Sequence, residues 1–150
     1  MAALNVINMN DLELEDWALE IGVEASCKAY EQGWDSLTEK EKCFCVVTDL
    51  EREVYNGGFD QFFYNSSGDF AVYTVEYLLK LGAVKTARIA KDAIALFHNS
   101  KPAQDQEARW AQIKEIDASS PMAWEELDDL FYDLEEHRHL IMYEYHQKNI

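Results

Sequence analysis

Apolar residues return every three or four positions along most of the chain, with short polar breaks between the runs. The first such run, with Trp17 and Ile21 on its apolar side, predicts a helix from about Leu12 to Glu31. After a break, Thr38 is followed three residues later by Glu41, a capping-box pattern that predicts the start of a second helix.

The second predicted helix contains a segment whose composition would also suit a strand. The segment is Cys43-Phe44-Cys45-Val46-Val47, which is rich in residues that favour strands. Its flanks, EKEK and DLEREV, are rich in strong helix formers, and we therefore interpret the whole region as helix. The helix is expected to end at Asn56-Gly57-Gly58, where glycine can adopt the left-handed conformation of a helix C-cap.

Further helical segments follow. One is predicted to be capped by Asp69 and to run to Leu81, because Gly82 provides a stop signal. The next two are predicted over Val84–Phe97 and Gln104–Ile116. Another is expected to start at Ser119-Ser120-Pro121, with proline in the first turn. The pattern leaves open whether the last stretch of the chain is one long helix or two.

These elements predict an all-α fold, a single compact domain of about six helices over residues 11–150, preceded by a flexible N-terminus at residues 1–10. A chain of 150 residues, 48% hydrophobic, has the size and the apolar content of one domain with its own core. The residues expected in that core are Trp17, Ile21, Phe44, Val47, Leu50, Phe59, Phe62, Phe63, Ile94, Phe97, Leu127 and Phe131.

The net charge limits the classes of molecule that the protein is expected to bind. There are 29 acidic and 13 basic residues, which gives a net charge of −16. Such a field repels nucleic acid and anionic membranes and attracts basic proteins, so neither direct nucleic-acid binding nor membrane binding is expected. The segment MAALNVINMN lacks the features of a signal peptide, and a cytoplasmic protein with reduced cysteines is expected.

Acidic residues gather in two regions at helical spacing. The first acidic stripe consists of Glu13, Asp16, Glu20 and Glu24. The second region contains Glu125, Glu126, Asp128, Asp129, Asp133, Glu135 and Glu136. Within it, Glu125, Asp129, Asp133 and Glu136 would share one helical face. Like charges four residues apart cost a helix roughly 0.2–0.5 kcal/mol per pair, and a local cost of this kind is typical of a functional, partner-binding surface. A merely solvated acidic face, with first-turn acids that favour the helix dipole, accounts for most of these residues without a partner, and the sequence leaves both interpretations open.

One aromatic segment is more distinctive than the rest of the chain. It consists of Asn56, Gly57, Gly58, Phe59, Asp60, Gln61, Phe62, Phe63, Tyr64 and Asn65. The two glycines permit positive φ, and the three phenylalanines fit one buried helical face. The polar residues can satisfy backbone groups at a helix break, so this segment is interpreted as a structural motif.

The run DLEREVYNGGFDQFFYNSSGD, followed by YLLKLGAVKTARIAKDAIALF, resembles an acidic bacterial DNA-mimic protein family. The later run LDDLFYDLEE is similar to the C-terminal region of that family, so that the resemblance covers roughly Thr38 to Glu136. It implies a helical homodimer whose partner is a helix-turn-helix transcription repressor. The mimic would occupy the DNA-binding surface of that repressor and relieve repression.

Two other classes of function compete with this interpretation. An immunity or antitoxin-like inhibitor of a basic nuclease or toxin would use the same acidic surface. An enzyme or metal protein would need ligand patterns that are incomplete here, because Glu136 and His139 form a single Glu-x-x-His and Cys43-x-Cys45 has no second pair. We therefore expect no enzymatic activity, no cofactor and no metal.

Overall fold

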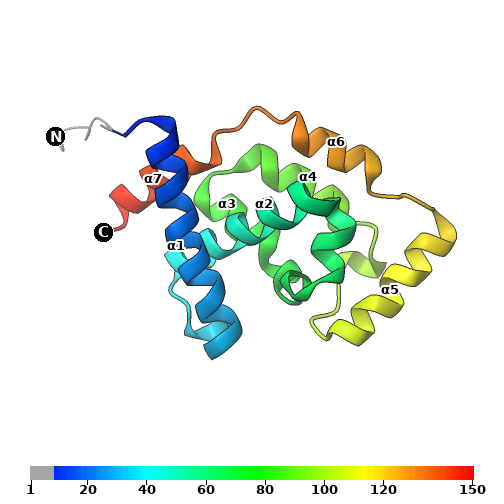
Figure 1. Ribbon diagram of the computed structural model, residues 1–150. Coiled ribbons are helices and arrows are strands. Elements are labelled where there is room, and N and C mark those ends of the chain that lie inside the picture. Colours follow the sequence, from blue (N-terminus) through cyan, green and yellow to red (C-terminus); the bar gives the residue numbers. More distant parts are fainter. Residues whose placement is uncertain (1–8) are drawn as a thin grey trace.

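Residues 9–150 are described by a computed structural model, and this part of the chain is all-α, without a strand (Figure 1). In chain order the elements are α1 (Asp11–Gln32), η1 (Trp34–Ser36), α2 (Glu39–Tyr64), η2 (Ser66–Tyr73), α3 (Thr74–Leu81), α4 (Val84–Ile94), η3 (His98–Ser100), α5 (Gln106–Ser119), α6 (Glu125–Tyr132) and α7 (Arg138–Lys148). The all-α prediction is confirmed, with seven α-helices in the described residues where about six were expected.

A capping box starts α1. The side chain of Asn10 accepts a hydrogen bond from the backbone N–H of Glu13 at 2.8 Å, and the Glu13 carboxylate accepts one from the N–H of Asn10 at 3.2 Å. These two bonds satisfy donors that the first helical turn leaves unpaired. Of the segment expected to be flexible, residues 1–10, only the last two lie within the described residues.

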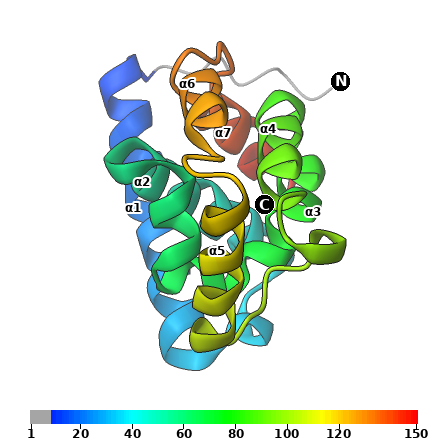
Figure 2. The same cartoon turned by 90° about the vertical axis from the view of Figure 1, so that its right-hand side faces the viewer.

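Helix α2 lies at the centre of the molecule. Figures 1 and 2 show α1 along one side of α2, α3 and α4 on the opposite side, and α6 and α7 across one end. The residues from Cys43 to Leu50 are buried on all sides of the helix, which confirms the helical interpretation of the strand-like run. Because α2 has neighbours all round, this part of the helix is buried on every face and mostly apolar, and its two polar side chains, Thr48 and Asp49, are buried as well.

Most of the predicted core is buried. Nine of the twelve expected residues are buried, namely Phe44, Val47, Leu50, Phe59, Phe62, Phe63, Ile94, Phe97 and Phe131. The other three, Trp17, Ile21 and Leu127, are partly buried and pack against this cluster from its edge.

Helix α2 is interrupted at the glycine pair, where the sequence predicted its end, because Gly57 and Gly58 both lie outside helical geometry. It bends there, with Gly58 at φ +79° and ψ −177°, and continues to Tyr64. The bend turns Phe59, Phe62 and Phe63 into the core, where each is at most 2% exposed. Burial of these three aromatic rings stabilises the helical segment that follows the bend.

Other helix boundaries also differ from the prediction. Asp69 does not cap a helix, because it lies within η2 and its carboxylate binds the guanidinium of Arg109 at 2.9 Å. Helix α4 ends at Ile94 rather than Phe97. Helix α6 starts at Glu125, not at the proline of Ser119-Ser120-Pro121, since the chain turns through Met122 at φ +60°.

The last stretch of the chain forms two helices. Helix α6 ends at Tyr132, and the C-cap residue Asp133 leads into a connection that precedes α7. The side chain of His137 caps α7 by accepting a hydrogen bond from the N–H of Leu140 at 3.3 Å.

Candidate protein-binding surface

The first acidic stripe lies on α1, and all four of its side chains are exposed. Residues four positions apart on a helix are separated by about 6 Å along the axis, so the carboxylates repeat once per turn. Glu13 takes part in the capping box. Asp16, Glu20 and Glu24 form no ion pair within residues 9–150, and their charge is available to a partner.

The second acidic region is arranged differently from the prediction. Glu125, Glu126 and Asp129 are exposed on α6, and Asp133 is exposed at its C-cap. Because the helix ends at Tyr132, Glu135 and Glu136 lie in the connection to α7. The expected helical stripe through Glu125, Asp129, Asp133 and Glu136 is therefore wrong beyond the end of α6.

Two acidic residues of this region hold the fold together. Asp128 accepts a hydrogen bond at 2.7 Å from the N–H of Phe59, directly after the bend in α2. Glu136 accepts bonds from the N–H groups of Lys85 and Thr86, both at 2.9 Å, and so caps α4. It also accepts a 2.6 Å bond from the hydroxyl of Thr86. We call the remaining carboxylates the acidic surface: Glu13, Asp16, Glu20, Glu24, Glu125, Glu126, Asp129, Asp133 and Glu135.

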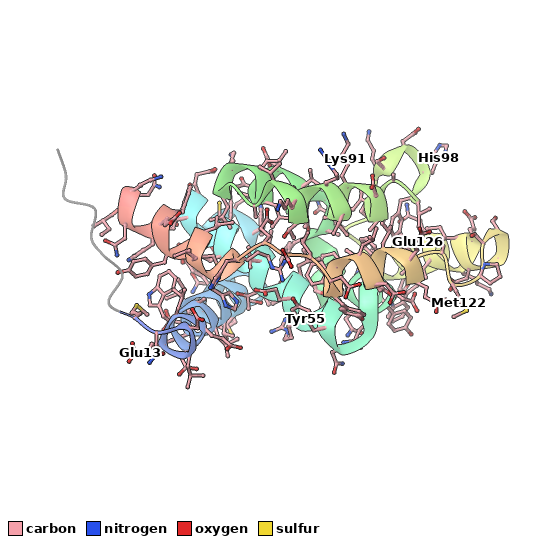
Figure 3. The ribbon with its side chains drawn as sticks, turned by 90° about the horizontal axis from the view of Figure 1, so that it is seen from above. Glu13, Tyr55, Lys91, His98, Met122 and Glu126 are labelled. Atoms are coloured by element: carbon pink, nitrogen blue, oxygen red, sulfur yellow. The ribbon has the colours of Figure 1, made fainter. Side chains whose placement is uncertain are left out.

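The two parts of the acidic surface approach each other where α1 meets the α6–α7 connection. Figure 3 shows Glu13 on α1 and Glu126 on α6, with Tyr55 of α2 between them. The ring of His137, after α6, lies 3.7 Å from the carboxylate of Asp11 at the start of α1. Helix α1 and the α6–α7 connection are therefore adjacent, although they are far apart in the sequence.

Basic side chains occupy another side of the molecule. Lys85, Arg88 and Lys91 are exposed on α4. Lys91 lies on the far side of α6 from Tyr55 in Figure 3. Lys91 is thus remote from Glu13 in Figure 3, whereas Lys85 borders the acidic surface, because its Nζ donates to the backbone carbonyl of Glu135 at 3.3 Å.

An acidic hollow of about 470 Å³ lies beside the start of α6. Its lining includes Asp60, Asp117, Glu125 and Asp128, and no lysine or arginine. Burial and the nearby charge of Asp117 raise the pKa of Asp60. Burial also raises the pKa of Asp128, assisted by the charges of Asp129 and Asp60 and opposed by the bond from the Phe59 N–H. Uncompensated negative charge is therefore concentrated at this end of the acidic surface.

The polar residues of the aromatic segment form hydrogen bonds with one another and with Glu53. The Asn56 amide donates to Gln61 at 3.0 Å. Gln61 and Asn65 both donate to the carboxylate of Glu53, at 2.7 and 3.0 Å. The exposed ring of Tyr64 stacks on Trp110 at 4.9 Å. These contacts support the structural interpretation, and Gly57 and Asp60 of the segment line the acidic hollow.

Two buried arginines have structural roles that were not predicted from the sequence. Arg109 is fully buried and donates to the carbonyl oxygens of Phe63 and Asn65, as well as to Asp69. Arg138, 5% exposed, donates to the carboxylate of Glu51 at 3.2 Å and to the hydroxyl of Tyr55 at 2.7 Å. The available signal for Arg109 was its position four residues before Ile113, on the buried face of α5.

Within residues 9–150, no group of three or more histidine, cysteine or acidic side chains is arranged to hold a metal ion. No helix of this range has the length and apolar character needed to cross a membrane. His139, which the sequence pairs with Glu136, instead binds Glu51 at 2.9 Å.

Comparison with known proteins places the chain in a family. No curated protein and no solved structure matches the chain. Residues 35–149 match the family described as DMP19-like protein. This range runs from η1 to α7 and includes the acidic residues of α6, whereas α1 and its acidic stripe precede it. Because the match covers more than half of the 150 residues, the chain belongs to the DMP19-like protein family.

Proposed function

We propose that this protein is a DNA mimic that binds the DNA-binding surface of a helix-turn-helix transcription regulator in place of DNA. Membership of the DMP19-like family, a family of DNA mimics, supports this class of function. The net charge of −16 supplies the long-range attraction that such a partner would follow. On this proposal the protein acts by binding and not by catalysis.

The observation that carries the proposal is the run of unpaired carboxylates on rigid helices. Asp16, Glu20 and Glu24 repeat once per turn of α1, and none of them has an ion-pair partner in the described residues. B-DNA presents one negative charge per about 1.7 Å of its axis, and its partners carry lysines and arginines in matching positions. A rigid row of carboxylates attracts the same basic groove without a nucleic acid.

The test is competition with DNA. A regulator recovered with the tagged protein from extracts of its own organism is mixed with labelled operator DNA, and the release of DNA is followed as the protein is added. Two charge-reversal variants replace Asp16, Glu20 and Glu24, or Glu126, Asp129 and Asp133, with lysine. Glu136 stays unchanged because it caps α4.

A third variant separates the effect of position from that of net charge. It carries lysine at Asp92, Glu115 and Glu144, which are exposed on α4, α5 and α7. Each of the three variants has a net charge of −10, since three reversals add six to −16. We expect the two acidic-surface variants to lose competition and the third to keep most of it. If all three compete as well as the parent protein, mimicry by this surface is wrong.

The nature of the recovered partner decides between the two inhibitory functions. A transcription regulator supports the proposal, whereas a basic nuclease or toxin supports the immunity-type alternative. The proposal also includes a homodimer, as the family resemblance implies, and sedimentation equilibrium of the purified protein measures that directly.

A further inference from the structure

Large apolar side chains are exposed between the two parts of the acidic surface. Leu12 and Leu19, on the same side of α1, are 66% and 56% exposed, and Tyr55 on α2 is 53% exposed. In Figure 3, Tyr55 lies between the helix that carries Glu13 and the helix that carries Glu126. The ring of Tyr132 stacks on Tyr55 at 6.0 Å and continues the apolar surface towards α6.

A groove of about 280 Å³ runs along this apolar surface, between α1 and α2. Leu19 and Tyr55 line its walls. The buried side chains of Ala18 and Met142 also line it and supply apolar surface at its base. The groove is therefore large enough for one or two aliphatic side chains and is apolar where they would be held.

The acidic side chains around the groove favour binding of a basic protein segment. Glu15 lines the groove, and Asp16 and Glu20 follow on the outer side of α1. Glu51 and His139 also line it, but Glu51 is engaged by Arg138 at 3.2 Å and by His139 at 2.9 Å. The one arginine of the groove, Arg52, is engaged by Asp49 at 3.0 Å and by Glu53 at 3.8 Å. A second copy of this chain would bring its own acidic stripe against the first, which disfavours it as the occupant.

We infer that the groove receives an aliphatic side chain of the protein partner, from a segment in which lysine or arginine flanks the apolar residue. The inference rests on the proposed function and adds to it a contact that DNA does not make. The carboxylates around the groove hold the basic groups of the segment, and Leu19 and Tyr55 enclose its apolar group. Apolar anchors surrounded by a charged rim are characteristic of protein–protein interfaces.

Two synthetic helical peptides of equal charge test the inference. One carries leucine along a single face and lysine elsewhere, and the other carries serine in place of every leucine. Binding is measured by fluorescence anisotropy on the parent protein, on Leu19→Ser and on Leu79→Ser. Leu79, 52% exposed on α3, is the matched control because the same change is made at a distant site of similar exposure.

The leucine peptide is expected to bind the parent at least about tenfold more tightly than the serine peptide, as burial of a leucine side chain predicts. Leu19→Ser should remove this difference and Leu79→Ser should keep it. The methyl resonance of Met142 should shift with the leucine peptide only. Equal binding of the two peptides to the parent, or loss of the difference in both variants, overturns the inference.

Sedimentation of the parent and of Leu19→Ser checks for self-association through the groove. If the parent is a dimer that this substitution dissociates, the occupant is a second copy and the inference is wrong. The proposed function is tested separately, by the competition of the lysine variants of Asp16, Glu20 and Glu24 with DNA. If the groove fails its test, the competition experiment still decides whether the protein acts as a DNA mimic.

Discussion

At the scale of single residues, acidic side chains in this protein have two different roles, since some accept structural hydrogen bonds and others remain exposed to solvent. Asp128 and Glu136 accept hydrogen bonds from backbone N–H groups far away in the sequence, at the bend of α2 and at the start of α4. Asp16, Glu20 and Glu24 have no such donors and remain in solvent. What separates the two groups is the presence of an unpaired backbone donor nearby, because an N–H at a helix end needs an acceptor.

Replacing Gly58 with alanine should destabilise the fold. Gly58 has φ +79° and ψ −177°, a conformation open to glycine almost alone, and an added Cβ would lie 2.4 Å from the Asp128 carboxylate. The backbone strain alone costs about 1–3 kcal/mol. Displacement of Asp128 from the N–H of Phe59 should add at least about 1 kcal/mol. Urea denaturation followed by circular dichroism measures the free energy of unfolding.

Gly33→Ala is the control for that experiment. Gly33 has a similar backbone conformation, φ +93° and ψ 155°, but no atom lies within 4 Å of the added Cβ. Gly58→Ala should therefore cost more than Gly33→Ala. Equal losses would mean that the Asp128 contact contributes nothing at the bend.

At the scale of helices, long-range caps fix where several elements begin. Helix α4 has Ala83 at its N-cap position and no cap from its own neighbouring residues, and Glu136 supplies the acceptor from 50 positions later in the chain. The α6–α7 connection is thereby tied to α4. Local capping signals cannot reveal such a contact, because the two partners meet only after the chain has folded.

Removing the Glu136 carboxylate should loosen the start of α4. In Glu136→Ala, the N–H groups of Lys85 and Thr86 lose their acceptor, and a lost cap costs about 0.5–2 kcal/mol. Hydrogen–deuterium exchange should become faster at those two amides and stay unchanged in α1. Glu135→Ala, which removes an exposed neighbouring carboxylate, should leave the exchange of both amides unchanged. Unchanged exchange at Lys85 and Thr86 in Glu136→Ala would contradict the capping role.

The contact between α7 and α2 should depend on pH. A hydrogen bond to Glu51 raises the pKa of His139 above its usual 6.5, although burial and the charge of Arg138 oppose this. Burial disfavours ionised Glu51, but the bonds from His139 and Arg138 outweigh it and lower its pKa. Stabilisation by the pair is therefore fully present below about pH 6.5 and is lost as the pH rises through the raised pKa of His139.

Melting temperatures of the parent protein and of His139→Gln measure this contribution. Their difference should be largest near about pH 6, where the imidazole is charged, and should shrink towards pH 8. His98→Gln, which changes an exposed histidine without an ion pair in the described residues, should show no such trend. A difference that grows with pH would contradict the charged pair.

The sequence was sufficient for the helices and most of the core, since these depend on local periodicity. The run from Cys43 to Val47 was correctly interpreted as helix from its flanks, and the phenylalanines at Phe59, Phe62 and Phe63 are buried as expected. The continuation of α2 beyond Gly58 and the start of α6 were not predictable, because tertiary packing decides whether a second helical segment follows the glycine break and where α6 begins. The structural roles of Asp128 and Glu136 could not be predicted, because the backbone N–H groups that they bind lie far away in the sequence.

At the scale of the whole molecule, the dominant feature is a net charge of −16 on a compact domain. Mutual repulsion of these charges opposes the compact state, while the same field attracts a basic partner. Dissolved salt screens both effects, with a screening length of about 30 Å at 0.01 M ionic strength and about 8 Å at 0.15 M.

Stability and binding should respond to salt in opposite directions. The melting temperature of the protein should rise as sodium chloride increases from about 0.01 M to about 0.15 M, because repulsion within the folded domain is screened. Over the same range its affinity for a basic partner should fall. Differential scanning fluorimetry and anisotropy measure the two quantities. A melting temperature that falls with salt would show that favourable ion pairs outweigh repulsion.

The separation of Lys91 on α4 from Glu13 on α1 makes the charge distribution of the molecule asymmetric, and an asymmetric distribution has a dipole component (Figure 3). In the field of a basic partner, a dipole experiences a torque as well as an attraction. The protein would therefore rotate its acidic side forward while the two molecules are still separated by solvent. Orientation before contact raises the fraction of collisions that are productive, which speeds association without adding a single contact to the final complex.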